Sequence, residues 1–94
     1  MRNLVVLFLE TTPHTVQRVK TALSNQDAAE LREAVHSLDN SVGVLGDTKA
    51  YEQLRIITEL THPLDWPQLG ERIAELDAHL LRLHSKLRRF LGTP

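Results

Sequence analysis

The sequence predicts an all-α fold, an antiparallel up-and-down four-helix bundle that forms one domain over residues 1–94. Three observations predict it. Apolar residues recur at spacings of three and four along most of the chain, which is the period of an amphipathic helix. Capping residues and helix-ending residues divide the chain into four segments. The turns between these segments are short, which favours antiparallel packing of neighbouring helices.

The first helix is expected over residues 2–23, with an interruption near Pro13. Proline lacks a backbone N–H and its ring clashes with the preceding helical turn. Thr12 as N-cap, with Pro13 at the first helical position, would restart the helix after the interruption. The inner face of the restarted helix consists of Val16, Val19 and Leu23.

The second helix is expected to begin after Asp27, because Asp27 and Glu30 have the spacing of a capping box. Gly46 is the natural stop at its C-terminal end. An apolar stripe at helical spacing runs between these two points and predicts the buried face. The stripe consists of Leu31, Ala34, Val35, Leu38, Val42 and Leu45.

Two further helices follow the same pattern of caps and apolar stripes. Asp47 caps the third helix and Pro63 ends it, whereas Asp65 caps the fourth helix and Gly92 closes it. Arg and Lys crowd the last turns of the fourth helix, where they suit the helix dipole. The predicted inner positions are Ala50, Leu54, Ile57 and Leu60 in the third helix, and Leu69, Ile73, Leu76, Leu80, Leu83, Leu87 and Phe90 in the fourth.

Composition excludes several classes of function. The net charge of -1 gives no electrostatic drive towards nucleic acid or an anionic membrane. The absence of cysteine excludes a disulfide framework and a thiolate metal site. The apolar run over residues 4–9 is too short to span a bilayer. We therefore expect a cytoplasmic domain with no nucleic-acid or membrane partner.

His36 is the residue of greatest chemical interest. On a helical wheel at about 100° per residue, with Leu31 at zero, His36 lies near 140° and points away from the apolar stripe. Gly43 lies near 120°, two turns further on, and would leave bare surface beside the imidazole. Two alternatives stay open here: His36 is an ordinary polar surface residue, and Gly43 serves close packing between helices.

A resemblance to a known family is a second reason to single out His36. His36-Ser37-Leu38 followed by Ser41, Gly43, Leu45 and Gly46 resembles the phosphorylation helix of histidine phosphotransfer (HPt) domains. The usual run in that family is His-Ser-Leu-Lys-Gly-Ser, then small residues, then Leu-Gly. The specific likeness covers residues 34–46, and a looser one extends over most of the chain.

The resemblance implies a phosphoryl-carrier protein and not a kinase, with no cofactor and no bound metal. His36 matches the phosphoacceptor position, and the partner would be a response-regulator receiver domain or a hybrid sensor kinase. The surrounding docking surface would consist of Arg32, Ser37, Asp39, Asn40 and Gly43. A neutral imidazole suits this role because it is nucleophilic near neutral pH.

Two positions depart from the family pattern. Asp39 stands where the family commonly has lysine, and Asn40 stands where it commonly has glycine. Asp39 would repel phosphoryl oxygens, although Arg32, one turn before His36, partly compensates. An alternative is therefore a degenerate HPt-like bundle that binds a receiver domain or another protein without phosphotransfer. A third alternative is a homodimer formed through the N-terminal apolar segment, residues 4–9.

Metal sites are not expected. The pairs Glu33/His36 and Glu59/His62 have the Glu-x-x-His spacing of di-iron bundles, but the first pair falls on the side away from the core. The histidines at positions 79 and 84 are five residues apart, whereas two ligands on one helix face are four apart.

Overall fold

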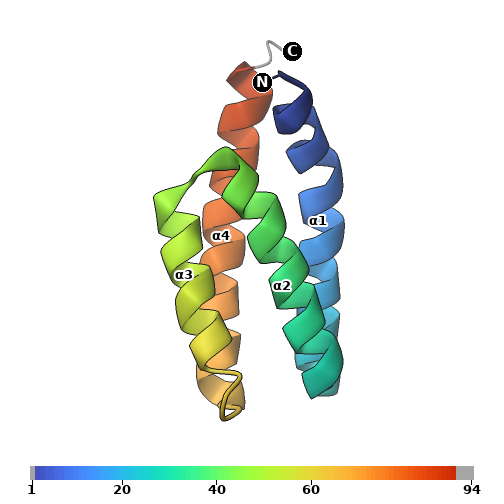
Figure 1. The fold of residues 1–94 in the computed structure, drawn as a ribbon, viewed down its shortest axis with the longest axis vertical. Helices are drawn as coiled ribbons and strands as arrows, with labels where there is room; N and C mark the ends of the chain where they lie inside the picture. The colour runs from blue at the N-terminus through green and yellow to red at the C-terminus, as the bar shows by residue number, and fades with distance from the viewer. Residues whose placement is uncertain (1, 91–94) are drawn as a thin grey trace.

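The computed structural model describes the backbone of residues 2–90 and the side chains of residues 5–43 and 45–90. It contains four helices: α1 (Arg2–Asn25), α2 (Ala28–Leu45), α3 (Thr48–Glu59) and α4 (Trp66–Phe90). They run alternately down and up the bundle, so the N-terminal end of α1 and the C-terminal end of α4 lie together (Figure 1). Contacts join α1 to α2, α2 to α3, α3 to α4, and α4 back to α1. The all-α antiparallel prediction is therefore confirmed, with Gly92 outside the described residues.

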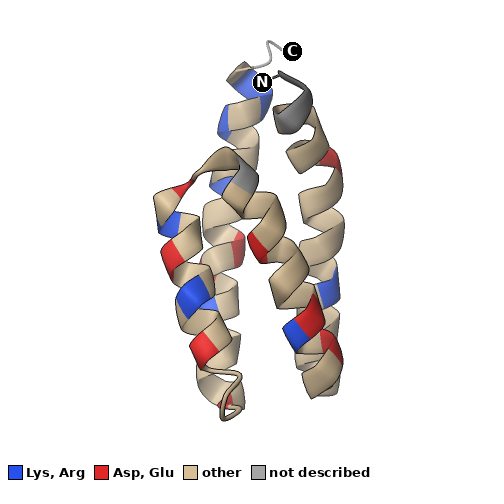
Figure 2. Ribbon diagram, viewed as in Figure 1, with Lys and Arg blue, Asp and Glu red and all other residues tan. Residues whose placement is uncertain are grey.

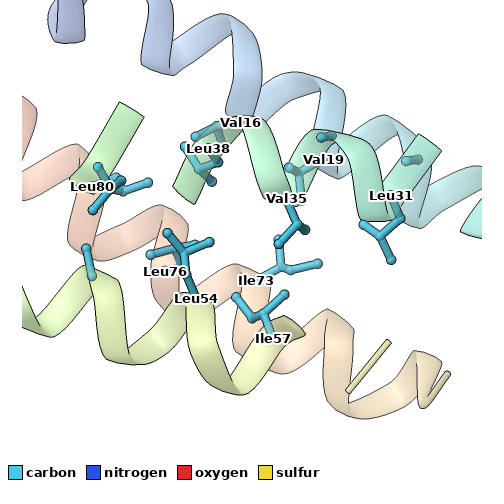
Figure 3. Close-up of a cluster of buried hydrophobic side chains, with 14 of the residues drawn as sticks. Val16, Val19, Leu31, Val35, Leu38, Leu54, Ile57, Ile73, Leu76 and Leu80 are labelled. Carbon is cyan, nitrogen blue, oxygen red and sulfur yellow. The ribbon is translucent and has the colours of Figure 1, made fainter. Parts of the chain in front are cut away.

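The core is built from one apolar stripe on each helix (Figure 3). The stripe predicted on α2 is buried from Leu31 to Val42, and only Leu45 at its end is partly exposed. In α3 the three residues Ala50, Leu54 and Ile57 are buried as predicted, whereas Leu60 is partly buried. In α4 burial is complete at Leu69, Ile73, Leu76 and Leu80, and partial at Leu83 and Leu87.

The prediction for Phe90 is wrong, because its side chain is 73% exposed. The reason lies in the lengths of the helices. The short α3 has 12 residues and α4 has 25, so α3 accompanies only part of α4. Of the described helices, α1 alone lies beside the C-terminal end of α4, which extends beyond the α2–α3 turn (Figure 1).

The predicted caps are present at three helix starts. Oδ1 of Asp27, Asp47 and Asp65 each accepts a hydrogen bond from the backbone N–H three residues later, at 3.2, 2.9 and 3.2 Å. Gly46 ends α2 in the left-handed conformation, at φ 71°, which glycine adopts at little cost. These local signals set the boundaries of α2 and α3.

The capping box at the start of α2 is only half formed. The backbone N–H of Asp27, which Glu30 would satisfy in a capping box, donates instead to the Ala22 carbonyl at 2.9 Å. The Glu30 carboxylate is therefore free to pair with Arg18 on α1, whose Nε and Nη2 donate to it at 3.1 and 3.0 Å. The hydrogen bond from Arg18 lowers the pKa of Glu30.

The predicted interruption at Pro13, with Thr12 as N-cap, is wrong. Helix α1 runs through Pro13 without a break, and Thr12 is buried within it. Pro13 cannot supply the N–H that would bond the carbonyl of Leu9. His84 Nε2 on α4 lies 3.3 Å from that carbonyl oxygen and donates to it. A side chain from a helix distant in sequence therefore satisfies the acceptor that the proline leaves free.

The N-terminal apolar segment is divided between core and surface. Val5 and Phe8 are buried in the bundle, whereas Val6 and Leu7 are exposed, Leu7 by 54%. Among the described residues, no helix is apolar over a stretch long enough to cross a membrane.

Candidate functional site

His36 lies in the middle of α2 with its side chain exposed. Its neighbours Val35 and Leu38 are buried in the core, and Leu31 is completely buried. The predicted outward orientation of His36 is therefore confirmed. An exposed imidazole is accessible to a phosphoryl group held in the cleft of another protein.

The imidazole borders a shallow groove of about 260 Å³ between α2 and the C-terminal end of α3. The residues that line the groove carry two hydroxyls, a carboxylate, a guanidinium and two imidazoles, so it is a polar site. Its lining consists of Arg32, Val35, His36 and Asp39 from α2, Thr58 from α3, and Thr61 and His62 from the α3–α4 turn.

Arg32 fixes the wall of this groove. Its Nη2 donates a hydrogen bond to the Thr61 carbonyl at 2.9 Å, which joins α2 to the α3–α4 turn. Thr61 is itself buried, and its hydroxyl donates to the Thr58 carbonyl at 2.6 Å. Arg32 is thus both a cation beside His36, as predicted, and a structural link that was not predicted.

Gly43 is exposed, and a Cβ placed on it would meet nothing within 4 Å. Close packing between helices therefore does not explain this glycine, which removes one of the two alternatives for it. What remains is a bare patch on the same helix as His36. Gly43 borders a second hollow, which it shares with Gly46, Asp47 and Tyr51.

The predicted docking residues do not all meet in one place. Arg32 and Asp39 lie in the groove with His36, whereas Gly43 lies at the second hollow. Ser37 is half-buried and Asn40 is exposed, and neither residue lines the groove or the second hollow. The predicted surface is therefore a strip along α2 with the groove near one end and the glycine near the other.

Asp47 is the ionisable group near this strip whose pKa is shifted. Partial burial of the carboxyl raises its pKa, but hydrogen bonds from the Ala50 N–H and from His79 outweigh burial and hold the pKa below its usual value. His79 Nε2 lies 3.2 Å from Asp47 Oδ1. This contact joins the start of α3 to α4.

Acidic and basic residues are interspersed along α2 and α3 in the view of Figure 2, and basic residues gather near the C-terminal end of α4. Around the groove itself the charged residues are Arg32 and Asp39. Within the described residues, no three His, Asp or Glu side chains are grouped as metal ligands.

Thr58, Thr61 and His62 are site residues that sequence reasoning did not identify. They lie 22 to 26 positions after His36, and no spacing rule for a single helix connects them to it. In the sequence, His62 stands out only as half of a Glu-x-x-His pair. Its place beside His36 depends on the antiparallel return of α3 along α2 and on the conformation of the α3–α4 turn.

Fold and site together define a class: a small up-and-down helical bundle that displays a histidine on the outer face of its second helix, beside a polar groove. The family model described as Hpt domain matches residues 3–86, and the chain therefore belongs to the Hpt domain family. Membership implies histidine phosphotransfer in a phosphorelay, with receiver domains or kinases as the general partners. Comparisons with curated proteins and with solved structures give no match.

Proposed function

We propose that this protein accepts a phosphoryl group on His36 from the aspartate of one receiver domain and passes it to another. The observation that supports this most strongly is the exposed imidazole of His36 on α2, beside a polar groove, in a bundle of the Hpt domain family. The partner is a response-regulator receiver domain or the receiver domain of a hybrid sensor kinase, in the cytoplasm.

The transfer follows from the chemistry of imidazole. A neutral ring nitrogen of His36 attacks the phosphorus of the aspartyl phosphate, a P–N bond forms, and the P–O bond to the aspartate breaks. The aspartate leaves as a carboxylate, and the phosphorylated ring carries the positive charge that balances it. Catalysis of phosphoryl transfer depends on in-line placement and charge neutralisation, so this side of the complex supplies mainly an accessible nucleophile.

Substitution of the nucleophile tests the proposal. The chain is incubated with a phosphorylated receiver domain, and the transferred label is examined for the acid lability of phosphohistidine. We expect label on the wild type and none on His36→Gln, with unchanged helicity because an exposed residue makes few stabilising contacts. His14→Gln, which changes another exposed histidine, is the control. Label retained on His36→Gln contradicts the proposal.

A second candidate function is a binding module that docks a receiver domain or another protein without phosphotransfer. The observation that favours it is Asp39, whose carboxylate lies in the same groove as His36. A negative charge there opposes a phosphoryl dianion. This candidate predicts receiver-domain binding that is equally tight with His36→Gln and no label on either protein.

A homodimer through the N-terminal apolar segment is a further proposal, supported by the exposure of Val6 and Leu7. Sedimentation equilibrium of the wild type and of Leu7→Glu tests it. A dimer that dissociates on this substitution supports the proposal, and a wild type that sediments as a monomer contradicts it.

A further inference from the structure

We propose that His62, together with Arg32, holds the phosphoryl group once it is on His36. This inference rests on the proposed function and names a further positioning residue for it. It starts from a juxtaposition in space: His62, from the α3–α4 turn, and Arg32, from α2, line the same groove as His36. The α3–α4 turn and the first part of α2 lie at the same end of the bundle (Figure 1).

The α3–α4 turn places His62 in the groove through a series of hydrogen bonds. The residue before His62, Thr61, is buried and accepts the bond from Arg32 at its carbonyl. The backbone N–H of His62 donates to the Glu59 carbonyl at 3.1 Å, and that of Asp65 donates to the Leu60 carbonyl at 3.0 Å. The backbone at position 62 is therefore fixed relative to α2, while the side chain of His62 is exposed.

The charges of the residues that line the groove indicate which of them would bind the phosphoryl group. Phosphorylation of His36 brings a doubly negative group next to Asp39, the one carboxylate among the residues that line the groove. The lining residues that carry positive charge are Arg32 at all pH values and His62 when it is protonated. Arg32 uses one N–H on Thr61, and a guanidinium has five, so it retains donors for phosphoryl oxygens.

The phosphoryl group and His62 are expected to affect each other. A dianion close to an imidazole favours its charged form and raises its pKa. Asp39 and Arg32, the other charged residues that line the groove, are present both before and after phosphorylation. A rise in the His62 pKa on phosphorylation of His36 therefore reports that the phosphoryl group lies close to the His62 imidazole.

Phosphoramidate provides a test that needs no partner protein. A ring nitrogen of His36 attacks its phosphorus, the original P–N bond breaks, and ammonia leaves with the electron pair. The histidine pKa values are followed by NMR before and after phosphorylation. We expect the His62 pKa to rise by about half a unit, as an exposed ion pair supports, and that of His14 to stay unchanged.

The lifetime of the phosphohistidine is the second readout. For His62→Gln we expect it to fall about two- to fivefold, the range of an exposed ion pair, with unchanged circular dichroism. His14→Gln is the matched control and should keep the wild-type lifetime. If His62 only stabilises the α3–α4 turn and does not lie next to the phosphoryl group, the pKa of His62 should not change when His36 is phosphorylated.

The outcomes separate this inference from the proposed function. If His36 is phosphorylated but the His62 pKa and the His62→Gln lifetime are unchanged, the inference is overturned and the proposed function stands. If His36 takes phosphate neither from phosphoramidate nor from receiver domains, both fall together.

Discussion

Asp39 and Asn40 are the residues that distinguish this site from the usual pattern of its family. Asp39 is half-buried in the groove beside His36, whereas Asn40 is exposed on the outer face of α2. A carboxylate at Asp39 opposes the arrival of a phosphoryl group, by about 1 kcal/mol at 4 Å in water and more where a partner excludes solvent. Asn40 adds a side chain to the surface that a partner must approach.

The first prediction concerns Asp39→Lys combined with Asn40→Gly. Phosphotransfer from a receiver domain to His36 should become faster, because a repulsive charge becomes attractive and bulk is removed. The gain should shrink as salt concentration rises, since an exposed charge interaction is screened. Rates of label transfer at low and high salt measure this. A double variant that takes no more label than an inactive wild type favours the binding-only function.

The second prediction concerns Pro13 and His84. His84→Leu removes the donor to the Leu9 carbonyl and should lower the free energy of unfolding by about 1 kcal/mol. In a Pro13→Ala background the backbone N–H at position 13 returns, so the same substitution should cost much less. Urea unfolding of both single variants and the double variant gives the coupling energy. If His84→Leu lowers the free energy of unfolding equally in both backgrounds, His84 does not compensate for the N–H that Pro13 lacks.

At the scale of the helices, the caps show how sequence determines boundaries. Asp27, Asp47 and Asp65 each cap a helix through a bond to a nearby N–H, so their role depends on short-range sequence alone. The apolar stripe of α2 is equally local, which is why the outward orientation of His36 was predictable. Asp47 also contacts His79 of α4, a partner that lies 32 positions away in the sequence.

The third prediction concerns Asp47 and pH. The pKa of Asp47 is lowered in the folded protein, so its charge stabilises the fold above about pH 4 and that contribution is lost as pH falls through the folded pKa. Asp47→Ala should cost about 1 kcal/mol at pH 7. Asp47→Asn keeps a capping oxygen and should cost less.

Urea unfolding from pH 7 down to pH 3 measures both variants. The difference in stability between the wild type and Asp47→Asn should shrink below about pH 4, where Asp47 takes up a proton first in the unfolded chain and, at lower pH, in the folded protein. Asp27→Ala removes a cap without affecting a histidine and serves as the control. A difference that grows as pH falls would contradict the assigned direction of the pKa shift.

Features that depend on contacts between distant segments were not predictable. The acceptor that Pro13 leaves free in α1 is satisfied by His84, which lies 75 positions after Leu9, and no local pattern around Pro13 indicates this contact. The exposure of Phe90 depends on where α3 stops accompanying α4. His62 joins the site through the path of the α3–α4 turn, whereas His36 was found from one helix alone.

At the scale of the whole molecule, the four described helices, each determined largely by local sequence, pack in one antiparallel order. Short turns dictate that order, so the fold was predictable from the positions of the caps. The groove is a product of the assembled bundle, because it needs α2 and the end of α3 side by side. The assembled bundle therefore positions the exposed imidazole of His36 beside this groove.

The central claim, that this protein both accepts and donates a phosphoryl group, is tested most directly by a relay between two receiver domains. One receiver domain is phosphorylated and purified, a second, unphosphorylated one is added, and the label on the second is followed over time. With the wild-type chain present, label should pass through an acid-labile intermediate to the second receiver domain, and with His36→Gln it should not. Binding of both receiver domains without any label on the second one would contradict the claim.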